Sequence, residues 1–228
     1  MPKKKLQQVA KQTSTPSDGQ NVIWPSITVK EDLLCRELIP DQIYIIDVHL
    51  LRYSNVYRLK NSDPTPPPKR GEATRVNHRI SFQSKDFALV LYNAISPHLP
   101  PLPSSETRAT DVAPVGCNSN IRLYKYDPGQ YFGAHYDDSV RDAATGWWSE
   151  WTILVYVTGH EDGVEGGETV FHQDVPGSKK KTEEIVPPLA RGSVLIHRHG
   201  RACMLHEGRE VKKGTKLVLR SDIMFARP

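Results

Sequence analysis

The second half of the chain consists of short apolar segments separated by glycine and proline, and this pattern limits the possible folds more than any other feature. The segments are rich in β-branched and aromatic residues, which favours strands. Strands of this length at such intervals are typical of a sandwich or a barrel, and no internal repeat is visible. The predicted strands are 121–126, 151–157, 168–172, 193–197 and 216–224.

The first half of the chain has a different composition. Residues 1–20 are mostly Lys, Gln, Ser, Thr and Pro. Such a segment buries too little apolar surface to offset the entropy lost on ordering, so we expect a disordered tail. A first strand is predicted at 43–48, whereas the clustered prolines of 61–71 indicate a loop. Residues 86–95 have the apolar spacing of a helix, which Pro97 ends.

Length and composition indicate a single domain over 21–228. No run of about 18 apolar residues occurs and the first residues lack an apolar signal-peptide core, so we expect a cytoplasmic or nuclear protein without a membrane partner. The three cysteines are widely spaced, which favours reduced thiols. The net charge of +4 is spread along the chain, which makes nucleic acid a less favoured partner. Lys3–Lys5 fit a nuclear-import signal, but a solvated tail is the preferred interpretation.

One pair of residues, His135 and Asp137, has the spacing of metal ligands. On an extended segment the side chains at i and i+2 project from the same face, so the imidazole and the carboxylate converge. Two histidines and one carboxylate bind one face of an iron(II) ion and leave positions open for a chelating co-substrate and O2. A second such pair, His172 and Asp174, ends a predicted strand and runs into a segment that reads as an exposed loop, so His135 is preferred.

The candidates for the third ligand are His197, His199 and His206. His206 is followed ten positions later by Lys216, at the start of the last predicted strand. A dicarboxylate co-substrate needs a cation for the carboxylate far from the metal, and Lys216 is our choice for it. Arg220 shares a face of the same strand, so it either replaces Lys216 in this role or contacts the metal-binding residues.

The stretches RLYKYDPGQYFGAHYDDS, WTILVYVTG, GGETVFH and MLHEGREVKKGTKLVLRSDIMF lie within 121–225. They resemble the 2-oxoglutarate and iron(II)-dependent oxygenase superfamily, in its prolyl 4-hydroxylase-like branch. The resemblance implies iron(II) bound by His135, Asp137 and His206, and 2-oxoglutarate held by Lys216. O2 is then the second co-substrate and ascorbate a reductant. The implied fold is mainly β with N-terminal helices, a double-stranded β-helix (jelly roll) whose catalytic core spans about 118–228.

The resemblance also concerns two tyrosines and a glycine pair. Tyr126 and Tyr156 match positions where relatives place tyrosines against the co-substrate, although both also fit an ordinary core. Gly166 and Gly167 match a tight turn that leads into a strand, where backbone geometry explains the glycines.

Two further segments have two interpretations each. Arg75, Asn77 and Arg79 either touch the substrate or, as we prefer, form a solvated loop. The segment 141–150, with its two tryptophans, is either an aromatic lid beside His135 or a packed connection.

The predicted function is hydroxylation of a protein or peptide side chain, with proline as the first candidate and with release of succinate and CO2. The proline-rich loop at 64–68 departs from well-known prolyl hydroxylases. This departure weakens the inference that the chain acts on the same substrate as those enzymes. One rival is a nucleic-acid demethylase or small-molecule oxygenase of the same superfamily. Such demethylases carry paired arginines after the distal histidine, and only Arg220 fits. Another rival is an inactive jelly-roll binding module, which has no need of a complete ligand set. The oligomeric state stays open.

Overall fold

The computed structural model describes residues 26–29, 35–39, 42–51, 65–99, 113–175, 177 and 181–226. The predicted tail at 1–20 lies outside these residues, and so does Lys3–Lys5. Within the described part of the chain, no helix is long and apolar enough to cross a membrane.

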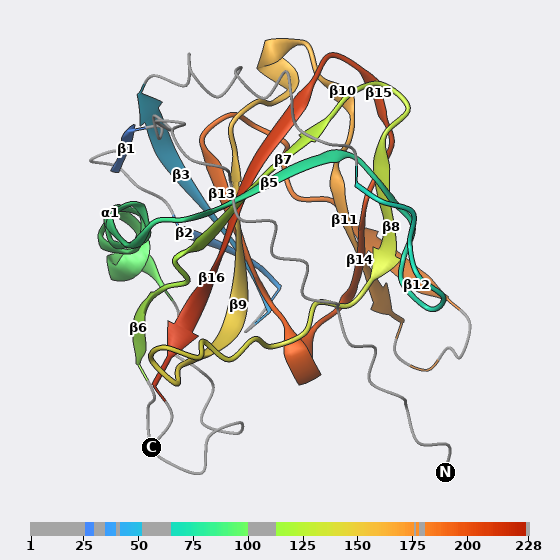
Figure 1. Ribbon diagram of the computed structural model, residues 1–228. Coiled ribbons are helices and arrows are strands. Elements are labelled where there is room, and N and C mark those ends of the chain that lie inside the picture. The colour runs from blue at the N-terminus through green and yellow to red at the C-terminus, as the bar shows by residue number, and fades with distance from the viewer. Residues whose placement is uncertain are drawn as a thin grey trace.

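Two antiparallel sheets face each other and form the jelly roll that the sequence predicts (Figure 1). The larger sheet has the order β1-β3-β13-β9-β16-β7-β5, with β2 paired to β3 and β6 paired to β16. Its strands are β1 (Ser26–Val29), β2 (Cys35–Ile39), β3 (Ile43–Leu51), β5 (His78–Gln83), β6 (Pro114–Cys117), β7 (Asn120–Tyr126), β9 (Trp148–Tyr156), β13 (Ser193–Arg198) and β16 (Lys216–Phe225).

The smaller sheet has the order β12-β11-β14-β8-β4, and a two-stranded ribbon of β10 and β15 adjoins the fold. These strands are β4 (Arg75–Val76), β8 (Tyr131–His135), β10 (Glu165–Gly166), β11 (Thr169–Asp174), β12 (Thr182–Ile185), β14 (Leu205–Gly208) and β15 (Val211–Lys213). Short 3-10 turns lie at Ser96–His98, His160–Asp162 and Gly200–Ala202.

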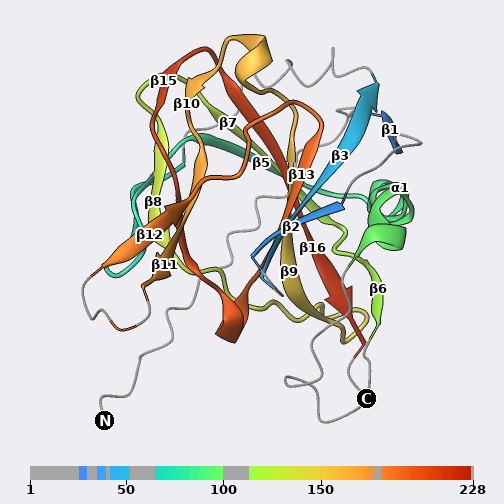
Figure 2. The same cartoon turned by 180° about the vertical axis from the view of Figure 1, so that it is seen from behind.

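The helix α1 (Lys85–Ile95) covers the face of the larger sheet that points away from the smaller one (Figures 1 and 2). The Ser84 side chain accepts a hydrogen bond from the Phe87 amide at 3.2 Å and so caps the first turn. Phe87, Leu91 and Ile95 recur at helical spacing, and all three are buried against the sheet. The predicted helix is therefore confirmed, and its apolar stripe is what docks it.

Strand β16 separates two apolar layers because its side chains alternate. Leu217 and Leu219 pack in the layer beneath α1, whereas Val218 packs in the layer between the two sheets. The charged residues Lys216 and Arg220 share the face of Val218. The inner layer is therefore where a polar site can form.

The five strands predicted in the second half, and the first strand at 43–48, are confirmed as β7, β9, β11, β13, β16 and β3. Among the strands that the structure adds are β8 and β14, whose sequences YFGAH and LHEG show no β-branched run. Both strands are short and contain a glycine and a histidine. The pattern of apolar residues therefore could not reveal them.

The preferred interpretation of 75–79 as a solvated loop is wrong. Arg75 belongs to β4, Arg79 belongs to β5, and Asn77 between them is only 1% exposed. The Asn77 carbonyl accepts a hydrogen bond from the Thr65 amide at 2.8 Å. Both arginines are thus fixed on strands, β4 pairing with β8 and β5 with β7.

Replacing Leu91 by Ala should lower the free energy of unfolding by about 2–5 kcal/mol, because the truncation leaves a cavity between α1 and the sheet. Leu91 is 0% exposed, whereas Leu89 on the same helix is 59% exposed. The matched variant Leu89→Ala should change stability by less than about 0.5 kcal/mol. Urea unfolding followed by circular dichroism measures both, and equal losses would contradict this packing of α1.

Candidate metal centre

The pairing of β8 with β14 brings two histidines together. His135 and His206 are direct cross-strand partners, and residues in that position have neighbouring side chains on one face of the sheet. Asp137 follows β8 by two residues, and its carboxylate oxygens Oδ1 and Oδ2 lie 3.7 Å from Nε2 of His135 and of His206, respectively. One donor atom from each of the three side chains lies within 4.8 Å of the other two.

The backbone orients both imidazole rings. His135 Nδ1 lies 2.8 Å from the Gly133 carbonyl oxygen, and His206 Nδ1 lies 2.9 Å from that of Met204. Each Nδ1 therefore carries the proton and donates it, which leaves the Nε2 lone pair free. The two Nε2 atoms each lie 3.7 Å from an oxygen of Asp137. Three electron-pair donors thus face one point.

The protonation states also suit a metal. Burial, together with the neighbouring His206, lowers the pKa of His135 to about 3, so its ring is neutral near pH 7. Burial raises the pKa of Asp137, but Arg220 and the nearby imidazoles hold it well below its ordinary value. Metal ligands must be deprotonated, and these residues already are. Neutral imidazoles with one carboxylate are a donor set that fits iron(II).

Arg220 and Thr152 hold the Asp137 carboxylate in place. Arg220 donates to Oδ1 at 3.0 Å, and the Thr152 hydroxyl donates to Oδ2 at 3.0 Å. Of the two roles considered for Arg220, the structure supports contact with the metal-binding residues. Thr152 was not found from the sequence because a threonine in an apolar strand carries no signal of such a role.

His197 is a third imidazole in this region, and the structure brings it close although His206 was preferred as the ligand. It lies on β13, is 1% exposed, and its Nε2 is 3.9 Å from Asp137 Oδ2. That Nε2 has no hydrogen-bond partner among the described residues. His199, the remaining candidate, is instead hydrogen-bonded to Thr152 through Nδ1 at 3.0 Å.

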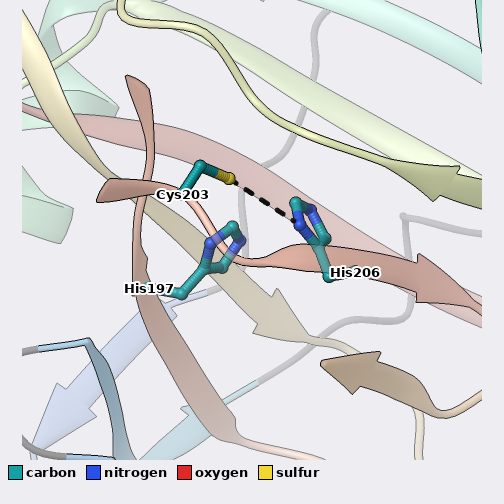
Figure 3. A group of neighbouring side chains, drawn as sticks. All are labelled: His197, Cys203 and His206. Carbon is teal, nitrogen blue, oxygen red and sulfur yellow. Dashed lines mark hydrogen bonds between the residues drawn. The ribbon is translucent and has the colours of Figure 1, made fainter. Parts of the chain in front are cut away.

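Figure 3 shows His197, Cys203 and His206 around a common space, with the Cys203 thiol directed at His206. The thiol lies 3.9 Å from His206 Nδ1, the nitrogen already bonded to the Met204 carbonyl. Burial raises the pKa of Cys203 to about 12, so the sulfur remains a protonated thiol, which is a poor metal ligand. The set with Asp137 is the better prepared of the two.

Lys216 lies in the same cavity as the three donors. The cavity is lined by His135, Asp137, His206, Lys216, Arg220 and Tyr126 together with other side chains. The Lys216 ammonium donates to the Gly167 carbonyl at 2.5 Å, and burial lowers its pKa to about 8. Gly167 has a φ of 76°, and a Cβ there would lie 3.3 Å from the Lys216 side chain. Glycine thus permits both the turn and the close approach.

The two tyrosines flank the Lys216 ammonium. Its Nζ lies 5.4 Å from the ring centroid of Tyr126 and 5.6 Å from that of Tyr156. The Tyr156 hydroxyl donates to Thr169 at 2.8 Å, whereas Tyr126 lines the cavity. Both also belong to the apolar layer between the sheets. Contact with a co-substrate stays a prediction for each of them.

The second pair, His172 and Asp174, lies apart from this donor set. Both residues belong to β11, which continues to Asp174 and pairs with β12, so the strand ends later than the sequence suggested. His172 Nε2 lies 3.4 Å from a carboxylate oxygen of Glu207. His172 is thus a strand residue with an acidic neighbour, and the preference for His135 agrees with the geometry.

The segment 141–150 forms a closed turn. Arg141 makes a β-bridge with Trp148, and the Asp142 amide donates to the Trp147 carbonyl at 2.8 Å. The Trp147 ring also lies 3.4 Å from the position of a Cβ built on Gly116. These contacts favour a packed connection over a lid.

Comparisons with known proteins point to one family. Residues 121–221 match the model of the 2OG-Fe(II) oxygenase superfamily, and this segment contains all three donor residues, Lys216 and Arg220. A search of curated protein sequences gives no significant match.

Several solved structures are similar. One is a prolyl hydroxylase from Trichoplax adhaerens in complex with a peptide fragment of the hypoxia inducible factor oxygen degradation domain. It is 14% identical to this chain with a TM-score of 0.53, and the match covers 81% of this chain and 84% of that one. A viral collagen prolyl hydroxylase from Paramecium bursaria Chlorella virus-1 is 22% identical with a TM-score of 0.43, over 68% and 81% of the chains. A Pseudomonas putida prolyl-4-hydroxylase is 14% identical with a TM-score of 0.43, over 71% and 77%.

The family match and the fold agree with the donor set that the strands assemble. Iron(II) is the cofactor of this superfamily, and 2-oxoglutarate and O2 are its co-substrates. Residues 121–221 therefore match the 2OG-Fe(II) oxygenase superfamily, and this match supports a 2-oxoglutarate-dependent dioxygenase.

Proposed function

We propose that the chain hydroxylates a side chain of a protein substrate, with proline as the first candidate, and that it releases succinate and CO2 from 2-oxoglutarate. The observation that carries the proposal is the convergence of His135 Nε2, Asp137 and His206 Nε2 in one cavity with a buried lysine. Proline peptides are the first candidates because the Trichoplax adhaerens prolyl hydroxylase, which has the same fold, was solved with a peptide.

The chain's own residues have distinct roles in this proposal. His135, Asp137 and His206 hold iron(II), which supplies the activation of O2 when it is bound. Arg220 and Thr152 keep the Asp137 carboxylate ionised and oriented. Lys216 binds the carboxylate of 2-oxoglutarate that lies far from the metal, in a dry environment where a charge-assisted hydrogen bond is strong. The apolar layer of the jelly roll excludes water from the reacting groups.

Replacing a predicted ligand should abolish both metal binding and turnover. We expect His135→Ala and Asp137→Ala to bind Mn(II), a redox-stable substitute, too weakly for detection by calorimetry, and to form no succinate from 2-oxoglutarate. The control His172→Ala changes the other histidine with this spacing and should retain both properties. Full turnover by the Asp137 variant would show that the ligand assignment is wrong.

Replacing Lys216 should weaken the binding of 2-oxoglutarate and leave the binding of the metal unchanged. We expect Lys216→Met to bind 2-oxoglutarate about 10-fold to 100-fold more weakly, the range for loss of a charge-assisted hydrogen bond, with Mn(II) affinity nearly unchanged. The control Lys213→Gln removes the same charge from a side chain that is 71% exposed. If Arg220→Gln loses 2-oxoglutarate binding while Lys216→Met keeps it, Arg220 is the partner instead.

The pH dependence of 2-oxoglutarate binding follows from the buried ammonium group of Lys216. Lys216 has a pKa of about 8 without co-substrate, so it is increasingly neutral above that pH. A bound carboxylate favours the ammonium form, and binding therefore takes up a proton. The affinity for 2-oxoglutarate should fall as pH rises through about 8, and titration calorimetry in buffers of different ionisation enthalpy should detect the proton. Affinity that stays constant from pH 7 to 9, by calorimetry, would contradict this role.

A further inference from the structure

Arginines from four strands gather around Tyr124 at the inner face of the larger sheet. Arg79 on β5 is the direct cross-strand partner of Tyr124 on β7, and Arg122 on β7 is the partner of Arg220 on β16. Arg75 on β4 completes the group, because its guanidinium carbon lies 5.9 Å from the Tyr124 ring centroid. The guanidinium carbon of Arg79 lies 5.8 Å from the same centroid.

Only two of these four arginines have carboxylate partners among the described residues. Arg122 forms an ion pair with Asp222, and Arg220 forms ion pairs with Asp137 and Asp222. Arg75 and Arg79 form none with any carboxylate in the described part of the chain, and the buried Nε of Arg75 has no hydrogen-bond partner there. The group therefore carries an excess of two positive charges.

The ionisation of Tyr124 reflects this excess. Burial raises the pKa of Tyr124, but Arg122, Arg79, Arg220 and Arg75 together lower it to about 8. A fully buried tyrosine hydroxyl without such neighbours would have a pKa above 10. The positive charge is therefore strong enough to overcome the cost of burying an anion at this place.

The excess charge borders the metal centre. The Arg75 guanidinium lies 4.9 Å from the Phe132 ring centroid, and that ring stacks on His135 with 3.7 Å between centroids. Phe132, Tyr124 and Arg220 line the same cavity as the metal-binding residues. On β16 the partner of Tyr124 is Val218, whereas Lys216 pairs with Tyr126. Arg79, the partner of Tyr124 on β5, therefore lies two residues along the sheet from the row of Lys216.

We propose that Arg75 and Arg79 bind a carboxylate of the substrate, so that the enzyme selects peptides with an acidic residue next to the residue it oxidises. The inference rests on the proposed function. A guanidinium group binds a carboxylate through two parallel hydrogen bonds, and the partly buried position beside aromatic rings strengthens them. The unpaired arginines form one compact pair beside the cavity, whereas a nucleic-acid backbone requires cations along an extended track. An acidic peptide is therefore the favoured ligand.

The test compares short fluorescein-labelled peptides in which a central proline is flanked by aspartates, asparagines or lysines. Binding is measured by fluorescence anisotropy on the full chain loaded with Mn(II) and 2-oxoglutarate, and turnover is measured separately with iron(II). We expect aspartate-flanked peptides to bind at least about 10-fold more tightly than asparagine-flanked ones, as for loss of one charge-assisted pair. Arg75→Gln and Arg79→Gln should remove this preference.

Further variants distinguish an effect of the arginine charge on peptide preference from an effect of lost packing. Arg79→Lys should retain part of the preference, and Arg79→Glu should reverse it toward lysine-flanked peptides, a result that simple loss of packing would not give. The matched control Arg70→Gln removes a charge from an exposed position shortly before β4 and should leave the preference intact. Binding of the aspartate-flanked peptide should also raise the pKa of Tyr124, followed by tyrosinate absorbance against Tyr124→Phe.

The outcomes distinguish the two proposals. If proline peptides are oxidised but their flanking charge has no effect on affinity, the carboxylate site is wrong and the proposed function stands. If no peptide of any charge binds or is oxidised, both fail. Tighter binding of a single-stranded oligonucleotide that depends on Arg75 and Arg79 would overturn the peptide assignment.

Discussion

A buried carboxylate, that of Asp137, connects the two sheets of the jelly roll. It follows β8 of the smaller sheet, and its partners Thr152 and Arg220 belong to β9 and β16 of the larger sheet. A buried anion is costly unless it is paired and hydrogen-bonded, so this position demands donors from the opposite sheet. The same contacts keep the carboxylate ionised and close to Nε2 of both His135 and His206, so they tie the two sheets together at the candidate metal centre.

On strand β16, the side chains that point to the inner face recur at every second residue. Lys216, Val218, Arg220 and Asp222 alternate with Leu217 and Leu219, which pack beneath α1. Because β16 pairs with both β9 and β7, a shift of its register by one residue would exchange the charged and apolar faces. The apolar contact with α1 therefore helps to hold Lys216 and Arg220 in the cavity, although α1 touches neither of them.

The sequence predicted most of the architecture because the strands of the larger sheet are buried and β-branched, and α1 has a clear apolar stripe. It also predicted His135, Asp137, His206 and Lys216 as site residues, and the structure brings these four side chains together at one cavity. It did not identify Thr152 or Phe132, because a lone threonine or phenylalanine in a strand has no local pattern of function. The interpretation of Arg75 and Arg79 was wrong for a related reason: β4 and β5 are short, polar strands, and only pairing with β8 and β7 shows that they border the cavity.

Arg75 and Arg79, which form no ion pair within the described part of the chain, precede the segment 121–221 that matches the superfamily, whereas the three candidate metal donors lie within it. The candidate metal centre and the positive charge beside the cavity thus belong to different stretches of one chain. Substitutions in β4 and β5 alter the electrostatic environment that a substrate meets without changing a single donor atom. The fold therefore allows selectivity to diverge by mutation while the reaction itself is inherited unchanged.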